Sequence, residues 1–220
     1  LRIAGQWNGA FLCDGVGLGK TYTGLMLIEK FAVFDKKRVL LISPKSVHDS
    51  VWMPKLKTML KHVEVGRIKP IKMTDLNNFD EEEFALLEDI EMIIIDEAHH
   101  FRNPLSDRYQ KLKKIINMGK KKKVFFLTAT PINNSIHDLY NMIKLFTKEE
   151  DAFFQDNVSI PNLWRHFQDL NEKIAKGKKL GGDKLIRELV VQRSRKYVID
   201  SMKMEKKDSL FPIPTPPKTI

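Results

Sequence analysis

A glycine-rich loop is the first feature of the sequence that could do chemistry. It follows the apolar run 10–13 and precedes a helix-compatible segment, 22–34. Glycines let backbone N–H groups close around anionic oxygens, and a helix N-terminus adds unpaired N–H donors and partial positive charge. The pattern favours a nucleotide phosphate site over a chance glycine-rich turn. The loop consists of Asp14, Gly15, Val16, Gly17, Leu18, Gly19, Lys20 and Thr21.

Two of these residues carry specific expectations. Lys20 is placed to reach the outer phosphates of a nucleotide, and the hydroxyl of Thr21 is placed to bind Mg²⁺. The usual phosphate-loop pattern begins with glycine, whereas this loop begins with Asp14. This difference at the first position weakens the match to the general phosphate-loop pattern, so a second motif is needed to support a nucleotide site.

The second motif is a pair of carboxylates, Asp96 and Glu97, that follows the apolar run 92–95. Four consecutive apolar residues are typical of a strand buried on both faces, and open α/β sheets bind ligands at the carboxyl ends of such strands. One carboxylate can hold Mg²⁺ while the next orients and deprotonates a water molecule. The alternative is a solvated acidic turn, and the preceding Gly-Lys-Thr loop makes the catalytic interpretation the stronger one.

The elements that must position these motifs alternate along the chain. We expect strands at 10–13, 39–43, 92–95 and 124–128, a weaker one near 67–73, and helices at 20–33, 49–61, 81–88, 106–117, 135–146, 162–175 and 183–200. Ser46 to Ser50 and Asn134-Ser135 are the expected caps of the second and fifth helices. Apolar strands that alternate with helices predict an α/β fold with a mostly parallel sheet and helices on both faces.

Composition sets broad limits on the protein. The chain has 220 residues, 42% of them hydrophobic, and one cysteine, Cys13, which we expect to pack in the first strand. No apolar run approaches the roughly 18 residues of a membrane span, and no signal-peptide pattern opens the chain. The chain begins without methionine and ends in a Pro-rich stretch, so we expect it to be part of a longer protein. A reducing compartment is expected.

A basic stretch accounts for part of the net charge of +10, because the segment 111–123 holds seven lysines and no acid. It is either a solvated helix face with a turn at Gly119 or a surface for a polyanion. The acidic run 80–83 is expected to be the first turn of a helix, where carboxylates complement the helix dipole.

Taken together, the motifs resemble those of the SWI/SNF-type branch of superfamily 2 helicase-like ATPases. In that family the phosphate loop begins with aspartate, so Asp14 is expected. The further segments that carry the resemblance are 41–45 (motif Ia), 73–75 (motif Ib), 96–103 (motif II, a DEAH box), 127–134 (motif III) and 189–196, followed by 216–218.

The resemblance implies a RecA-like P-loop lobe with ATP as substrate, Mg²⁺ as cofactor and duplex DNA as partner. It implies that Lys20, Asp96 and Glu97 are catalytic, with Glu97 as the general base, and that Thr21 and Asp96 hold the metal. His99, Thr128 and Thr130 would relay the state of the γ-phosphate. The candidates for backbone contacts with DNA are Pro44, Lys45, Arg102 and Asn133.

The resemblance also implies an organisation. We expect an ATP-binding lobe at 1–150, a helical extension that braces it at 151–211, and a linker at 212–220 toward a second RecA-like lobe. The compartment would be the bacterial or archaeal cytoplasm, near the nucleoid, or a eukaryotic nucleus. Two alternatives stay open: the motor lobe of a restriction-type translocase, and a nucleic-acid-binding scaffold whose ATP site does not hydrolyse.

Overall fold

The computed structural model describes residues 2–15, 17–64, 66–130, 132, 135–177 and 182–192. In this part of the chain six strands form one sheet in the order β3-β2-β4-β5-β1-β6, and every neighbouring pair is parallel. The predicted parallel sheet is therefore confirmed. The strands are β1 (Gly9–Leu12), β2 (Val39–Ser43), β3 (Ile68–Lys72), β4 (Met92–Asp96), β5 (Lys123–Leu127) and β6 (Val190–Val191).

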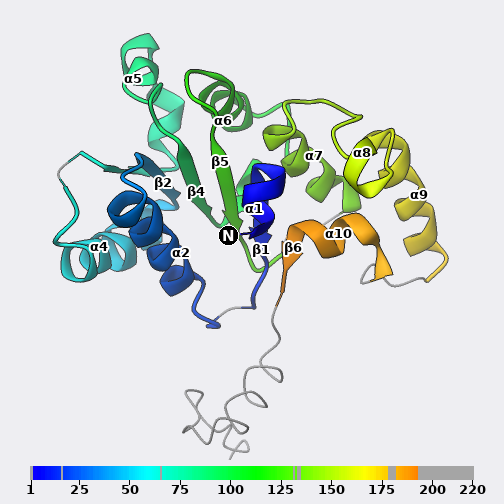
Figure 1. Ribbon diagram of the computed structural model, residues 1–220, viewed down its shortest axis with the longest axis horizontal. Coiled ribbons are helices and arrows are strands. Elements are labelled where there is room, and N and C mark those ends of the chain that lie inside the picture. Colours follow the sequence, from blue (N-terminus) through cyan, green and yellow to red (C-terminus); the bar gives the residue numbers. More distant parts are fainter. Residues whose placement is uncertain are drawn as a thin grey trace, which may run out of the picture.

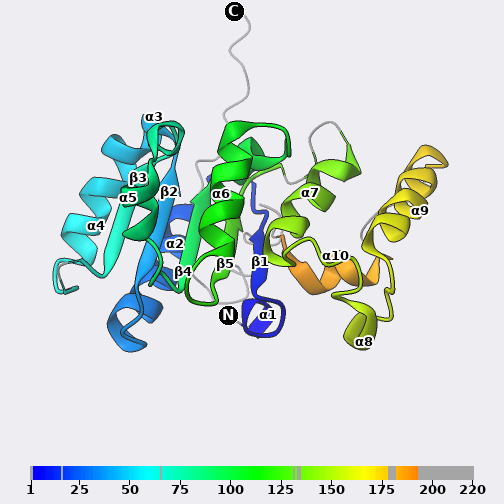
Figure 2. The ribbon, with the colours of Figure 1, turned by 90° about the horizontal axis from the view of Figure 1, so that it is seen from above.

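Helices cover both faces of the sheet, with α2 and α4 on one side of the strands and α5, α6 and α7 on the other (Figure 1). Seen from above, α8, α9 and α10 form the end of the molecule beyond β1, and α4 lies at the opposite end (Figure 2). The α-helices are α1 (Arg2–Trp7), α2 (Lys20–Ile28), α3 (Lys45–Val47), α4 (Met53–Met59), α5 (Glu81–Ala85), α6 (Asp107–Asn117), α7 (Ile136–Phe146), α8 (Gln155–Val158), α9 (Leu163–Ala175) and α10 (Lys184–Leu189).

Four tighter or wider helical turns complete the described elements. The π-helical turns η1 (Glu29–Phe34) and η2 (His48–Trp52) adjoin α2 and α4, and the 3₁₀ turns η3 (Asp75–Asn78) and η4 (Ala98–Phe101) follow β3 and β4. Because η2 joins α3 to α4, helical backbone runs without a break from Lys45 to Met59.

Alternate residues of each strand face opposite cores, as the period of a strand requires. In β4, Ile93 and Ile95 pack with the residues of α5, α6 and α7, whereas Met92 and Ile94 pack with those of α2 and α4. All five residues of β2 and of β4 are buried. Burial on both faces explains why these strands read as continuous apolar runs.

Several caps follow the sequence. Ser135 accepts a hydrogen bond from the backbone of His137 at the start of α7, and Asp80 forms a capping box with Glu83 at the start of α5. The prediction that Ser46 to Ser50 cap a helix at 49–61 was wrong, because helical structure already begins after Pro44. The hydroxyl of Ser50 instead donates to the carbonyl of Ser46 inside the helix, 2.7 Å away.

The prediction of a single helix at 183–200 was also wrong. The helix α10 ends at Leu189, and Val190–Val191 form β6 beside β1. Residues 193–200 and the predicted linker at 212–220 lie outside the described residues. Since β6 joins the main sheet, the segment after residue 150 contributes to the lobe itself; the domain boundary at 150 stays a prediction.

The lysine-rich segment is largely engaged in packing and ion pairs. Lys113 and Lys114 lie 2.6 Å from carboxylate oxygens of Glu149 and Glu81. Lys122 is buried, and its ammonium donates to the carbonyl of Lys120 at 3.1 Å. These contacts favour the structural interpretation of the segment over a surface for a polyanion.

Replacement of Gly9 by alanine is expected to destabilise the fold. A Cβ at this position of β1 would stand 2.4 Å from the Cγ of Phe146, in a packed core. Overpacking of this kind costs about 1–3 kcal/mol. Gly5→Ala is the matched control, because nothing lies within 4 Å of its Cβ and it lies in α1. Urea unfolding of both variants measures the difference; equal midpoints would contradict the close approach at Gly9.

Candidate functional site

The phosphate loop leaves β1 at the carboxyl edge of the sheet and ends where α2 begins. Gly17 and Gly19 have φ angles of 81° and 83°, a region that glycine adopts without the strain that a Cβ brings. Gly19 is the residue before the first turn of α2. The two glycines therefore give the loop the curvature that its sequence predicted. Val16 lies outside the described residues.

Lys20 is held over the loop that precedes it. Its ammonium donates to the carbonyl oxygens of Asp14, at 2.9 Å, and Gly15, at 3.3 Å. The backbone N–H of Leu18 donates to the same Gly15 carbonyl at 3.3 Å, which closes the turn. Thr21 follows in the first turn of α2 and is partly exposed. The cation that would face a phosphate is thus already positioned by backbone carbonyls.

The carboxylate pair stands at the end of β4, and β5 alone separates this strand from β1. Asp96 is 7% exposed, and both of its oxygens accept hydrogen bonds. The indole Nε1 of Trp52 donates to Oδ2 at 2.8 Å, and the backbone N–H of Glu97 donates to Oδ1 at 3.0 Å. Glu97 has a left-handed backbone, φ 50°, and its side chain is 36% exposed. One carboxylate is therefore fixed, and its neighbour reaches toward solvent.

Burial governs the protonation of this pair. It raises the pKa of Asp96, and the N–H groups of Trp52 and Glu97 and the charge of Lys20 offset part of that rise. It also raises the pKa of Glu97, and the adjacent Asp96 adds to the effect. A carboxylate with a raised pKa is a better proton acceptor than an ordinary surface glutamate.

The predicted coupling residues meet at this edge. The Nδ1 atom of His99 lies 3.2 Å from Oε2 of Glu97 and 3.3 Å from Oγ1 of Thr128. Thr128 is fully buried at the end of β5, and its hydroxyl accepts from the N–H of Thr130 at 3.3 Å. Burial and the charge of Arg102 lower the pKa of His99, which favours the neutral form of its imidazole. His99 therefore links β4 to β5.

The donor set fits Mg²⁺. In the described ranges neither Asp96 nor Glu97 has a lysine or arginine nitrogen within 4.0 Å. Burial raises the pKa of both carboxyl groups, so a nearby cation would stabilise their charged forms. Carboxylate and hydroxyl oxygens are the ligands that Mg²⁺ takes in phosphate-transfer sites. Asp96 and Thr21 are the residues that would hold the ion. No cluster of three or more His, Cys, Asp or Glu side chains suited to a metal occurs among the residues that were described.

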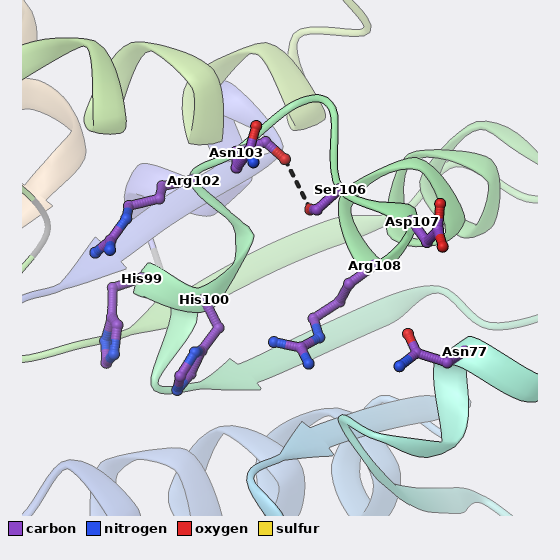
Figure 3. A pocket seen from close by; sticks show the side chains of 8 residues that line it. All are labelled: Asn77, His99, His100, Arg102, Asn103, Ser106, Asp107 and Arg108. Atoms are coloured by element: carbon purple, nitrogen blue, oxygen red, sulfur yellow. Dashed lines mark hydrogen bonds between the residues drawn. The ribbon is translucent and has the colours of Figure 1, made fainter.

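A cavity of about 560 Å³ adjoins the carboxylate loop. Figure 3 shows Arg108, Asn77 and His100 pointing into the same space, whereas Asp107 points away. Nη1 of Arg102 and Nε of Arg108 are buried and have no hydrogen-bond partner in the described part of the chain. Burial, His99 and Arg108 lower the pKa of His100. The cavity thus presents two arginines without carboxylate partners among the described residues, which is the chemistry that binds an anion.

The structure brings most predicted site residues to one edge of the sheet. Lys45 is exposed in the first turn of α3, and Pro44 precedes it at the end of β2. Asn133 lies outside the described residues. Trp52, Asn77 and Arg108 were not predicted. Arg108 lies six residues beyond Arg102, and a basic residue so close to motif II could have been recognised from the sequence. No such signal marks Trp52, because its contact with Asp96 joins residues 44 positions apart.

Two protein-family models match the sequence of this chain. A model of the SNF2-related domain matches residues 78–212, and a model of the type III restriction enzyme res subunit matches residues 8–133. Each match covers more than half of the chain. The chain belongs to the SNF2-related domain family.

One curated protein is similar to this chain in sequence, and two solved structures are similar in fold. An uncharacterized ATP-dependent helicase, YqhH, of Bacillus subtilis is 29% identical over 156 residues, which is 66% of this chain and 27% of that protein. The Sulfolobus solfataricus SWI2/SNF2 ATPase core in complex with dsDNA matches 88% of this chain and 43% of its own, with TM-score 0.58 and 20% identity. The Sulfolobus solfataricus SWI2/SNF2 ATPase core domain matches with TM-score 0.61 and 20% identity, over 90% of this chain and 42% of its own. The predicted RecA-like fold is confirmed, and the chain spans less than half of each of these relatives.

Within the described ranges, every helix is too short or too polar to cross a bilayer.

Proposed function

We propose that the chain is the ATP-binding lobe of a nucleic-acid-dependent ATPase that moves along duplex DNA. The observation that carries the proposal is the placement of Lys20 and the pair Asp96–Glu97 at one sheet edge. The pair ends β4, Lys20 begins the helix after β1, and β5 lies between these two strands. The charge of Lys20 acts on both carboxyl groups. The names of the relatives, an ATP-dependent helicase and a SWI2/SNF2 core with dsDNA, support it. The compartment would be the cytoplasm of a bacterium or archaeon, or a eukaryotic nucleus.

Each residue has a defined task in this proposal. The N–H groups around Gly17 and Gly19 cradle the phosphates, and Lys20 exchanges its carbonyl contacts for phosphate oxygens. Mg²⁺, when bound by Thr21 and Asp96, would neutralise charge on the phosphate oxygens.

Proton transfer and coupling fall to the residues beside the metal ligands. Glu97 orients a water molecule and accepts its proton, aided by its raised pKa. His99, in contact with Glu97 and Thr128, reports the state of that proton to β5 and Thr130.

DNA contacts are proposed at Lys45, Arg102 and the arginine-lined cavity with Arg108. Contacts of this kind go to the phosphate backbone, so they position the protein without reading sequence. The unpartnered guanidinium nitrogens supply the donors that phosphate oxygens would accept.

Arg108→Ala is expected to weaken binding of the full-length protein to duplex DNA uniformly across sequences. Loss of one phosphate contact should reduce the slope of log affinity against log salt by about 1. Fluorescence anisotropy over a range of salt concentrations measures both quantities. Lys176→Ala, at an exposed site after α9, is the control and should leave the slope unchanged. Equal slopes in all three proteins would contradict the placement of DNA at the cavity.

The proposed activity is tested with the full-length protein, with and without duplex DNA. ATP hydrolysis that rises on addition of duplex DNA supports the proposal. ATP binding without hydrolysis, with or without DNA, would indicate the scaffold alternative.

A restriction-type motor is the second candidate, favoured by the match of residues 8–133 to the type III restriction enzyme res subunit. ATP-dependent cleavage of duplex DNA by the full-length protein would identify that class. Hydrolysis and movement without cleavage would identify the first.

A further inference from the structure

Trp52 contacts the predicted metal carboxylate from a segment of the chain that no motif assigned to the ATP site. Its indole is fully buried, and Nε1 donates to Oδ2 of Asp96 at 2.8 Å. Since the N–H of Glu97 holds Oδ1, a separate donor fixes each oxygen of the carboxylate. The indole of Trp7 is also buried and gives a contrast, because its Nε1 has no hydrogen-bond partner among the described residues.

The ring of Trp52 is also held against the helix that follows the phosphate loop. A Cβ placed on Gly24 in α2 would stand 2.6 Å from Cη2 of Trp52. The absence of a side chain at Gly24 is therefore what lets the indole reach Asp96. One side chain thus packs on α2, which begins at Lys20, and donates to the carboxylate at the end of β4.

The backbone of Trp52 belongs to the same helical run as the proposed DNA contact. Helical structure continues from Lys45 through η2, whose last residue is Trp52, and into α4. At its start, the buried side chains of Ser43 and His48 are joined by a 2.8 Å hydrogen bond, which ties the run to the end of β2. Continuous helical backbone therefore connects Lys45 to the indole, seven residues further along.

We propose that Trp52 is a positioning residue that orients the Asp96 carboxylate for Mg²⁺ and links the segment at Lys45 to the metal site. The inference rests on the proposed function. Partners that hold a metal-binding side chain in place change metal affinity or activity by 10–100-fold when they are replaced. The position of Trp52 adds a route by which DNA at Lys45 alters the site without touching it.

Trp52→Phe in the full-length protein removes the N–H and keeps an aromatic ring in the space. Binding of a fluorescent ATP analogue is followed as Mg²⁺ is varied, so the readout does not depend on hydrolysis. We expect the Mg²⁺ concentration at half-maximal binding to rise about 10–100-fold. Affinity for duplex DNA should stay unchanged, while the stimulation of hydrolysis by DNA should fall.

Trp7→Phe is the matched control, since it replaces a buried indole whose N–H forms no hydrogen bond within the described ranges. It should leave the Mg²⁺ midpoint unchanged, and thermal unfolding of both variants shows whether they are equally folded. Gly24→Ala is a second test, because its Cβ would displace the indole of Trp52 from Asp96 without removing the N–H from the side chain. It should also raise the midpoint.

The inference would be overturned by an unchanged midpoint in Trp52→Phe or in Gly24→Ala, or by equal shifts in Trp52→Phe and Trp7→Phe. These outcomes would leave the proposed function standing. If the unaltered full-length protein binds the analogue at no Mg²⁺ concentration, the proposed function falls, and the inference with it.

Discussion

Glu97→Gln in the full-length protein is expected to abolish ATP turnover while ATP binding is retained. The amide keeps the size and hydrogen-bonding reach of the side chain but cannot accept a proton from water. Glu97 is suited to that task because burial and Asp96 raise its pKa and because part of its carboxylate reaches solvent. A general base contributes about 10²–10⁴-fold to a rate, so the loss should fall in or above that range.

Steady-state hydrolysis and equilibrium binding of ATP, measured on the same preparation, separate the two properties. Glu172→Gln, at an exposed position of α9, is the matched control and should keep normal turnover. Turnover by Glu97→Gln within about tenfold of the unaltered protein would show that another group is the base.

The 220-residue chain alone is expected to bind ATP weakly and to hydrolyse it barely. The family resemblance implies that the arginine completing the site belongs to a second RecA-like lobe. An arginine supplied in this way is worth about 10³–10⁵ in rate for related phosphoryl transfer. The same factor should separate the isolated chain from the full-length protein at saturating ATP and duplex DNA.

Circular dichroism and thermal unfolding establish that the isolated chain is folded before its rate is compared. Addition of the second lobe as a separate polypeptide should restore part of the lost rate. Strong DNA-stimulated turnover by residues 1–220 without it would show that the catalytic residues are all on this chain.

The central sheet could be predicted because its strands are specified locally. The strands at 39–43 and 92–95 are apolar at every position, and only burial on both faces explains such runs. The positions of Lys20, Asp96 and Glu97 followed, because parallel strands bring their carboxyl ends to one edge. The motif order then gave the family, which the SNF2-related match confirms.

The parts that could not be predicted depend on contacts between distant residues. Val190 and Val191 continue a helical pattern locally, yet they pair with Phe11 and Leu12 some 180 positions away. The bond between Trp52 and Asp96 is of the same kind, since nothing near Trp52 in sequence marks it as part of an ATP site. The cavity with Arg108 and Asn77 is of the same kind, because it lies between η3, which holds Asn77, and the start of α6, which holds Arg108.

The pairing of β6 with β1 has a mechanical consequence. The N–H of Cys13, the residue before the phosphate loop, donates to the carbonyl of Val191 at 2.7 Å. Hydrogen-bonded parallel strands resist sliding along their length, because several bonds share a force applied at one end. This bond joins Val191 directly to the residue at the root of the phosphate loop. A pull on β6 would therefore act on the nucleotide site at the residue where the phosphate loop begins.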